Sequence, residues 1–168
     1  MDWFQFVAQW LHVLMGITWF GAAITMNFIV LPAMGKLPMD RQREFGRHLG
    51  EQADYVLIRV AMAVITLGVL RGTLFGPIKS LDALTTQYGI TWLVALVAGI
   101  STFLWGTRVV GAGIHRMNSI PVEKAFNPDG TMTSAFSDAF ALVKRNGMIE
   151  LLGFFVLFTC MILMRFGL

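Results

Sequence analysis

Long apolar stretches, separated by polar connections, dominate the pattern of this chain. Four of them are long enough to cross a bilayer, which requires about 20 mostly apolar residues per helix. Two contain no Asp, Glu, Lys or Arg, at residues 3–35 and 83–107. The apolar residues are continuous and do not alternate, which excludes β-barrel strands and predicts helices. The predicted spans cover about residues 3–33, 53–75, 88–113 and 146–167.

The connections between these spans differ in kind. Residues 36–52 are polar and have helical spacing over most of their length, so their helix is expected to continue into the second span. Residues 76–82 form a short turn, whereas residues 114–145 hold a turn signal followed by an amphipathic stretch. We therefore predict an all-α fold, with residues 1–168 forming a single transmembrane domain built as an integral membrane four-helix bundle.

Composition supports this prediction. Hydrophobic residues make up 56% of the chain and charged residues only 14%, against about 25% charged residues in a soluble domain. This excludes a disordered chain and strongly disfavours a soluble globular domain. Cys160 is the single cysteine, so no intrachain disulfide can form. The N-terminal sequence MDWFQF lacks a basic segment and a cleavage site, so we interpret it as the start of a span and not as a signal peptide.

The distribution of basic residues predicts the orientation. Nine of them follow the first and third spans: Lys36, Arg41, Arg43, Arg47, Arg108, Arg116, Lys124, Lys144 and Arg145. Three lie on the opposite side: Arg71, Lys79 and Arg165. Basic residues are concentrated in cytoplasmic loops, so both termini are expected on the outer side. This topology accounts for the net charge of +3 without a nucleic-acid partner.

His12 is the first candidate for chemistry. It lies about 13 Å into the first span, at a rise of 1.5 Å per residue. It belongs to a stripe of polar, small and aromatic residues on an otherwise aliphatic helix: Gln5, Gln9, His12, Gly16, Trp19, Ala23 and Asn27. Such a stripe faces other helices and not lipid. His12 is then either a heme-iron ligand, with Gly16 leaving room for a flat porphyrin, or a neutral histidine bonded to a neighbouring helix.

A second axial ligand would lie at a similar depth, where the other spans carry no histidine. Met161 or Met62 can serve, since His/Met ligation of heme is known. Met161 can equally be an ordinary packing residue, because methionine commonly fills helix contacts. A five-coordinate iron, or a second ligand from another subunit, is also consistent with the sequence.

A second group of candidates lies toward the cytoplasmic side. Arg59, Arg108 and Glu150 occur at similar depths in three spans, and pairing would offset the cost of charge in the membrane. They predict either a structural ion pair or an anion, propionate or proton-relay site. His48 and His115 can bind a metal together with a nearby glutamate, or can be solvated polar residues near headgroups.

The first span carries a resemblance to a known superfamily. Its sequence WLHVLMGITWFGAAITMNFIVLPAM, with the pattern Leu11, His12, Trp19 and Gly21, resembles the first span of a broad superfamily of bacterial four-helix membrane proteins. These include the N-terminal membrane domain of some urate-oxidising proteins, the membrane part of copper resistance protein D, and heme-dependent membrane protoporphyrinogen oxidases. The stretches IRVAMAVITLGVLRG and WGTRVVGAG resemble later spans of these proteins. The third span lacks the lysine of the oxidases.

The resemblance implies a heme b protein of the bacterial inner membrane, with His12 as a ligand. We expect a redox or electron-transfer role, in which a quinone or another redox partner exchanges electrons and the chain can form a homo-oligomer. Whether it is an enzyme is left open. The expected cofactor-binding residues are His12, Gly16, Trp19, Arg59, Arg71, Arg108 and Met161. The alternatives are a heme-dependent oxidase of a porphyrin or purine, a non-catalytic assembly subunit, and a copper or other metal carrier that uses Met15, Met26, Met34 and His12.

Overall fold

Four long helical stretches form the molecule. The structure is a computed structural model that describes residues 2–167, without the side chains of residues 39, 40 and 122. The first stretch is α1 (Trp3–Thr25), the π-helical turn η1 (Met26–Val30) and α2 (Leu31–Met34); the second is α3 (Met39–Thr73); the third is α4 (Gln87–Trp105), the π-helical turn η3 (Gly106–Gly111) and α5 (Ala112–Ser119); the fourth is α7 (Ser134–Arg165). Short helices η2 (Asp82–Thr85) and α6 (Val122–Ala125) lie in the connections, and residues 2–167 form no strand.

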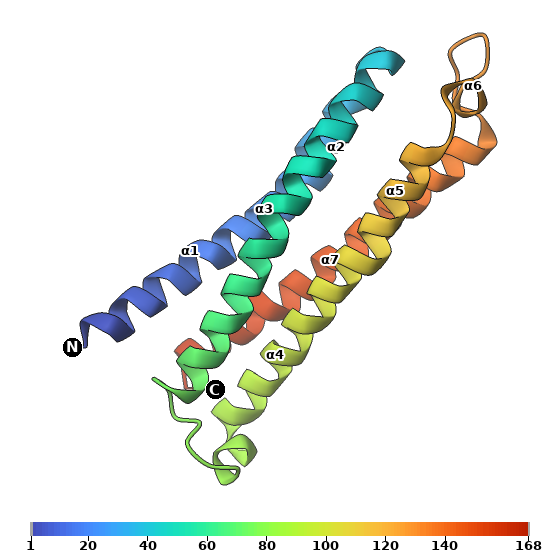
Figure 1. Cartoon of the computed structure of the whole chain (residues 1–168). Coiled ribbons are helices and arrows are strands. Elements are labelled where there is room, and N and C mark those ends of the chain that lie inside the picture. Colours follow the sequence, from blue (N-terminus) through green and yellow to red (C-terminus); the bar gives the residue numbers. More distant parts are fainter. Residues whose placement is uncertain (1, 168) are drawn as a thin grey trace.

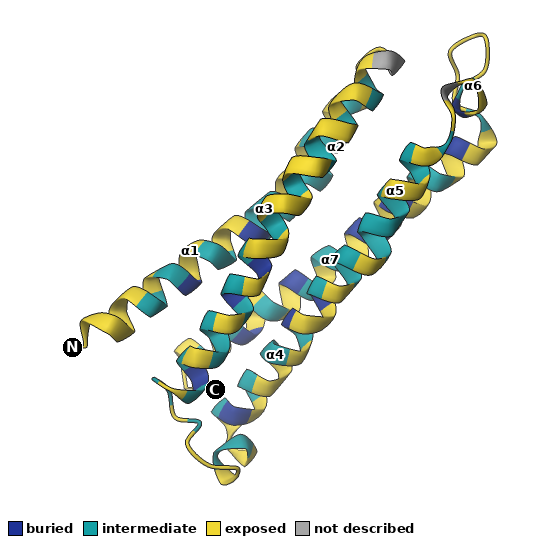
Figure 2. Ribbon diagram, in the orientation of Figure 1, coloured by how far each residue is buried: buried dark blue, intermediate teal, exposed yellow. Residues whose placement is uncertain are grey.

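These stretches have the length and hydropathy of membrane spans. Each is a helix of 32 or 33 residues that contains a strongly apolar window. Most of this apolar surface faces outward, as Figure 2 shows, and large side chains such as Leu152 and Phe155 are 68% and 65% exposed. A soluble monomer rarely exposes so large an apolar surface. The chain is therefore a multi-pass membrane protein with an all-helical fold.

The second and fourth helices extend beyond the predicted spans. The spans were placed from about residues 53 and 146, and α3 begins at Met39 and α7 at Ser134. The expected continuation of the polar segment into the second span is confirmed. These added turns are more polar than the spans and make contacts of their own, because Arg43 Nη2 donates to the carbonyls of Asn118, at 2.8 Å, and Ile120.

Pro32 accounts for the irregular end of the first stretch. A proline inside a helix lacks an N–H, and its ring clashes with the carbonyl four residues earlier. The chain widens into the π-helical turn η1 just before it, where the N–H of Leu31 donates to the carbonyl of Met26, five residues back. Helical geometry thus continues to Met34 in spite of the proline.

The helices associate as two pairs. α1 packs most extensively on α3, and α4 on α7, whereas the contacts of α3 with α4 and of α1 with α7 are smaller. Figure 1 shows the two pairs diverging toward the end that carries α6, while both chain ends and the connection between α3 and α4 lie at the opposite end. The core between the pairs centres on Trp19, Ala61, Val64 and Phe154.

Close approach between the helices depends on glycine. Several polar or aromatic side chains lie directly against a glycine of the facing helix, where an added Cβ would overlap or crowd them; we call these glycine contacts. They are His12 on Gly68, Trp92 on Gly72, Glu150 on Gly106, Asn27 on Gly147 and Thr102 on Gly153. Small residues at interfaces are what allows membrane helices to pack closely.

Replacing Gly72 by alanine should destabilise the fold, because the new Cβ would overlap the Trp92 indole. Overpacking of this kind costs about 1–3 kcal/mol. Gly21→Ala is the matched control, since no other group lies within 4 Å of an added Cβ there. The measurement is the thermal unfolding midpoint of both variants in the same detergent. Equal midpoints would show that the α3–α4 contact tolerates the added methyl group.

Candidate functional site

The principal cavity lies between the two helix pairs. Its volume is about 400 Å³, and its walls come from α1, α3, α4 and α7. This is within the range of about 300–1,000 Å³ that is usual for cofactor and ligand sites. Five of the seven residues predicted to bind a cofactor line it together: His12, Gly16, Trp19, Arg71 and Met161.

His12 is held in a single orientation by the neighbouring helix. Its side chain is buried, with 7% of the residue exposed, and its Nδ1 lies 3.0 Å from the carbonyl oxygen of Val64. A carbonyl only accepts hydrogen bonds, so Nδ1 carries the proton and donates it, which leaves the lone pair on Nε2. Within residues 2–167, Nε2 has no hydrogen-bond partner. Metal-binding histidines typically donate their other ring N–H in this way.

Glycine makes room for the imidazole ring. A Cβ on Gly68 would lie 3.1 Å from Cε1 of His12, so the ring packs directly against the backbone of α3. Gly16, one turn after His12, and Gly99 on α4 also line the cavity without adding side chains to it. The space beside the imidazole is therefore open and bounded mainly by apolar groups.

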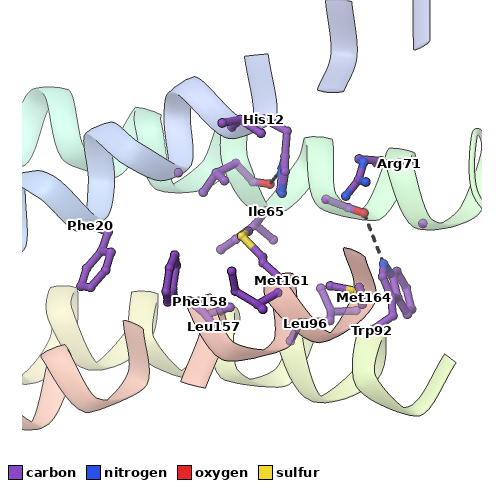
Figure 3. A pocket seen from close by; sticks show the side chains of 18 of the residues that line it. His12, Phe20, Ile65, Arg71, Trp92, Leu96, Leu157, Phe158, Met161 and Met164 are labelled. Carbon is purple, nitrogen blue, oxygen red and sulfur yellow. Dashed lines mark hydrogen bonds between the residues drawn. The ribbon is translucent and has the colours of Figure 1, made fainter. Parts of the chain in front are cut away.

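Met161 enters the cavity from the other helix pair. Figure 3 shows its side chain directed from α7 into the space that His12 enters from α1. Met62, the other methionine considered as a second ligand, is 56% exposed and does not line the cavity. Met164 lines the cavity one turn nearer the end of α7.

Two arginines line the same cavity near the ends of their helices. Arg71 lies in the last turn of α3 and Arg165 is the last residue of α7. No carboxylate of the described residues lies within 4.0 Å of either guanidinium. Both are therefore available to an anionic group at this end of the cavity.

Comparisons with protein-family models, curated proteins and solved structures find no match to this chain. The geometry of the cavity is therefore the basis for inferring its function.

Arg59 and Arg108, the two other arginines expected at the cofactor, lie outside the cavity. Both are exposed. Arg59 folds back along its own helix, where its guanidinium donates to the carbonyl of Tyr55 at 2.6 Å and lies 3.5 Å from the centre of the Tyr55 ring. Neither pairs with Glu150, so the ion pair predicted from their similar depths does not form.

The structure gives no support to the metal site considered for His48 and His115. His115 Nε2 lies 3.8 Å from the carboxylate of Asp54 on α3, and His48 is exposed. The described part of the chain contains no group of three His, Cys, Asp or Glu residues that could hold a metal ion. The exposure of both histidines agrees with the alternative, that they are solvated polar residues.

Some residues of the site were not singled out from the sequence. The carbonyl of Val64 and the α-carbon of Gly68 orient His12, and Trp92 closes the opposite wall by donating its Nε1–H to the carbonyl of Gly68 at 3.3 Å. Backbone groups carry no signature of their own in a sequence. The spacing of Val64, Gly68, Arg71 and Gly72, all on one face of α3, is the signal that could have indicated this wall.

The tautomer of His12 is directly testable. In protein labelled with ¹⁵N-histidine and free of any ligand, Nδ1 of His12 should carry the proton and Nε2 should be bare, because Val64 accepts only from Nδ1. The measurement is the pair of imidazole nitrogen chemical shifts, with exposed His48 as the internal reference for an unconstrained ring. A protonated Nε2 in neutral His12 would contradict the hydrogen bond.

Proposed function

We propose that this chain is a membrane-embedded heme b protein with a redox or electron-transfer role, in which His12 ligates the iron through Nε2. The observation that carries the proposal is the hydrogen bond from His12 Nδ1 to Val64, which leaves Nε2 unpartnered in a cavity of about 400 Å³. A structural histidine would ordinarily use both nitrogens in contacts. This one keeps the metal-binding nitrogen free.

The other walls fit a porphyrin. The cavity is largely apolar, and Gly16 and Gly99 line it without side chains that would keep a flat group away from the helix backbones. Arg71 and Arg165 are suited to bind propionates, because guanidinium donors match carboxylate geometry. Met161 is the candidate for a sixth ligand. When bound, the iron porphyrin supplies one-electron transfer, and axial His and Met ligands favour a raised reduction potential.

The orientation follows from the same proposal. The four spans act as a bundle in the bacterial inner membrane, with both termini outside and the basic connections in the cytoplasm. The heme site then lies in the outer half, where a quinone dissolved in the lipid is a suitable redox partner.

The alternative of a copper or other metal carrier is less well supported. It requires Met15, Met26 and Met34 to act with His12, but 8 to 11 residues separate consecutive methionines along the first stretch. At 1.5 Å per residue this is about 12–17 Å, too far for one ion. Met34 instead packs against Gly46 of α3.

Replacing His12 by alanine tests the iron ligand. Protein purified from heme-replete cells should show a Soret band, and His12→Ala should lose most of it, with partial recovery when free imidazole is added. His48→Ala, an exposed histidine, is the matched control and should keep the full band. A colourless, iron-free wild type, or a His12→Ala variant with an unchanged spectrum, would falsify the proposal.

Met161→Leu tests the sixth ligand, with Met164→Leu as its control in the same cavity. We expect Met161→Leu to retain heme but to change from a six-coordinate to a five-coordinate spectrum and to lower the midpoint potential, since a thioether ligand favours the reduced iron. Met164→Leu should change neither. If both variants keep the wild-type spectrum, the sixth ligand is not Met161.

A further inference from the structure

A second polar site lies in the inner half of the molecule. Both π-helical turns of the described chain, η1 and η3, pack against α7. Turns of this kind occur frequently at functional sites, because the widened helix frees backbone groups and reorients side chains. The polar residues at this junction include Asn27 of η1 and, on α7, Asn146 and Glu150.

The Glu150 carboxyl lies against the backbone of Gly106, the first residue of η3, where an added Cβ would overlap its Oε1. Asn146, one turn earlier on the same face of α7, is buried, with 6% exposed. Its side-chain amide makes no hydrogen bond within residues 2–167 and is not fully enclosed, so it is open to a neighbouring group.

Asn27 adds a third oxygen at this junction. Its Nδ2 donates to the carbonyl of Ala23 at 2.9 Å, and its Oδ1 lies against Gly147, the residue next to Asn146. The amide is therefore oriented with its oxygen toward α7. Three oxygen-bearing side chains thus converge on about one turn of a single helix.

No positive charge neutralises Glu150. Among the elements packed near it, α4 and η1 carry no charged residue, α1 carries only His12, and η3 carries only Arg108, which is exposed. His115 and Arg116 of α5, and the other charged residues of α7, are all exposed. No cation of the described residues is within 4.0 Å of the carboxyl.

The depth of Glu150 makes this lack of a partner significant. Glu150 is 15 residues from Arg165, or about 22 Å along the helix, within a hydrocarbon layer about 30 Å thick. An ionised carboxylate without a counter-ion is strongly disfavoured there. The group must therefore be neutral or hold a positive ion.

An aromatic layer separates this site from the His12 cavity. Phe154, one turn outward from Glu150, contacts Trp19 edge-on at 4.7 Å between ring centres and stacks on Phe20 at 5.4 Å. These three rings line the inner end of the cavity. Glu150 does not line it, so the two sites are distinct.

We propose that Glu150 is an intramembrane proton-binding site, assisted by the amides of Asn146 and Asn27. A proton from water adds to one carboxylate oxygen to give the neutral acid, and an amide oxygen accepts the resulting O–H. No electron moves and no other bond changes. The site does not depend on heme binding at His12.

The test uses the wild-type protein in lipid vesicles and N,N′-dicyclohexylcarbodiimide, an apolar reagent that adds to protonated carboxyl groups in membranes. At neutral pH, Glu150 should be labelled at least about tenfold more than Glu51, because the apolar reagent collects in the membrane and Glu51 is exposed. Labelling should fall as the pH is raised. Mass spectrometry of peptides reads both sites in one sample, whether or not a chromophore is bound.

Two variants and one competition sharpen the result. Glu150→Gln should remove the adduct, and Asn146→Leu should change the pH at which labelling falls, because it removes the amide one turn earlier on α7. Protection of Glu150 by sodium at constant pH would overturn the proposal in favour of a site for an alkali cation. Failure of Glu150 to label at any pH, while the protein remains folded, would also overturn it.

Discussion

Hydrocarbon offers no hydrogen bonds, so each polar side chain within the spans needs space inside the protein. In this chain the space comes from glycines of the facing helix. His12 rests on Gly68, and Glu150 rests on Gly106. Each contact brings two helices close at one point and orients one polar side chain there. The cavity and the inner polar site both depend on this arrangement, since a methyl group at Gly106 would overlap the Glu150 carboxyl and one at Gly68 would crowd the His12 ring.

The sequence predicted the spans well, because their signal is the long apolar run itself. It also indicated helix outside the spans, because residues 36–52 have helical spacing and residues 114–145 include an amphipathic stretch; α3 and α7 extend into these segments. The π-helical turn before Pro32 was not predicted, because the response of a helix to an internal proline depends on its neighbours.

For the candidate site, the helix face on which a residue lies mattered more than its depth in the membrane. Arg59 and Arg71 both lie in the second span, and Arg59 was predicted to bind the cofactor from its depth alone. Arg71 shares a helix face with Val64 and Gly68, whereas Arg59 points away and contacts Tyr55. A helix turns by 100° per residue, so this distinction was present in the sequence. The hydrogen bond of His12 to Val64 was not, because its acceptor is a backbone carbonyl and any residue type provides one.

The two sites divide the molecule by chemistry. One is apolar, with the unpaired Nε2 of His12 and peripheral arginines; the other gathers oxygens around a carboxyl that has no cation among the described residues. Trp19, Phe20 and Phe154 lie between them as a layer of packed rings.

The packing of the helices as two pairs has a consequence for how the protein folds after it enters the membrane. Each pair consists of neighbours in the chain, α1 with α3 and α4 with α7, so each can fold as an antiparallel hairpin soon after it enters the bilayer. The contacts between the hairpins are smaller, and we expect them to form last. A large rigid ligand can thus enter laterally while the halves are still apart, and their closure would then enclose it without any need for a permanent opening to the water.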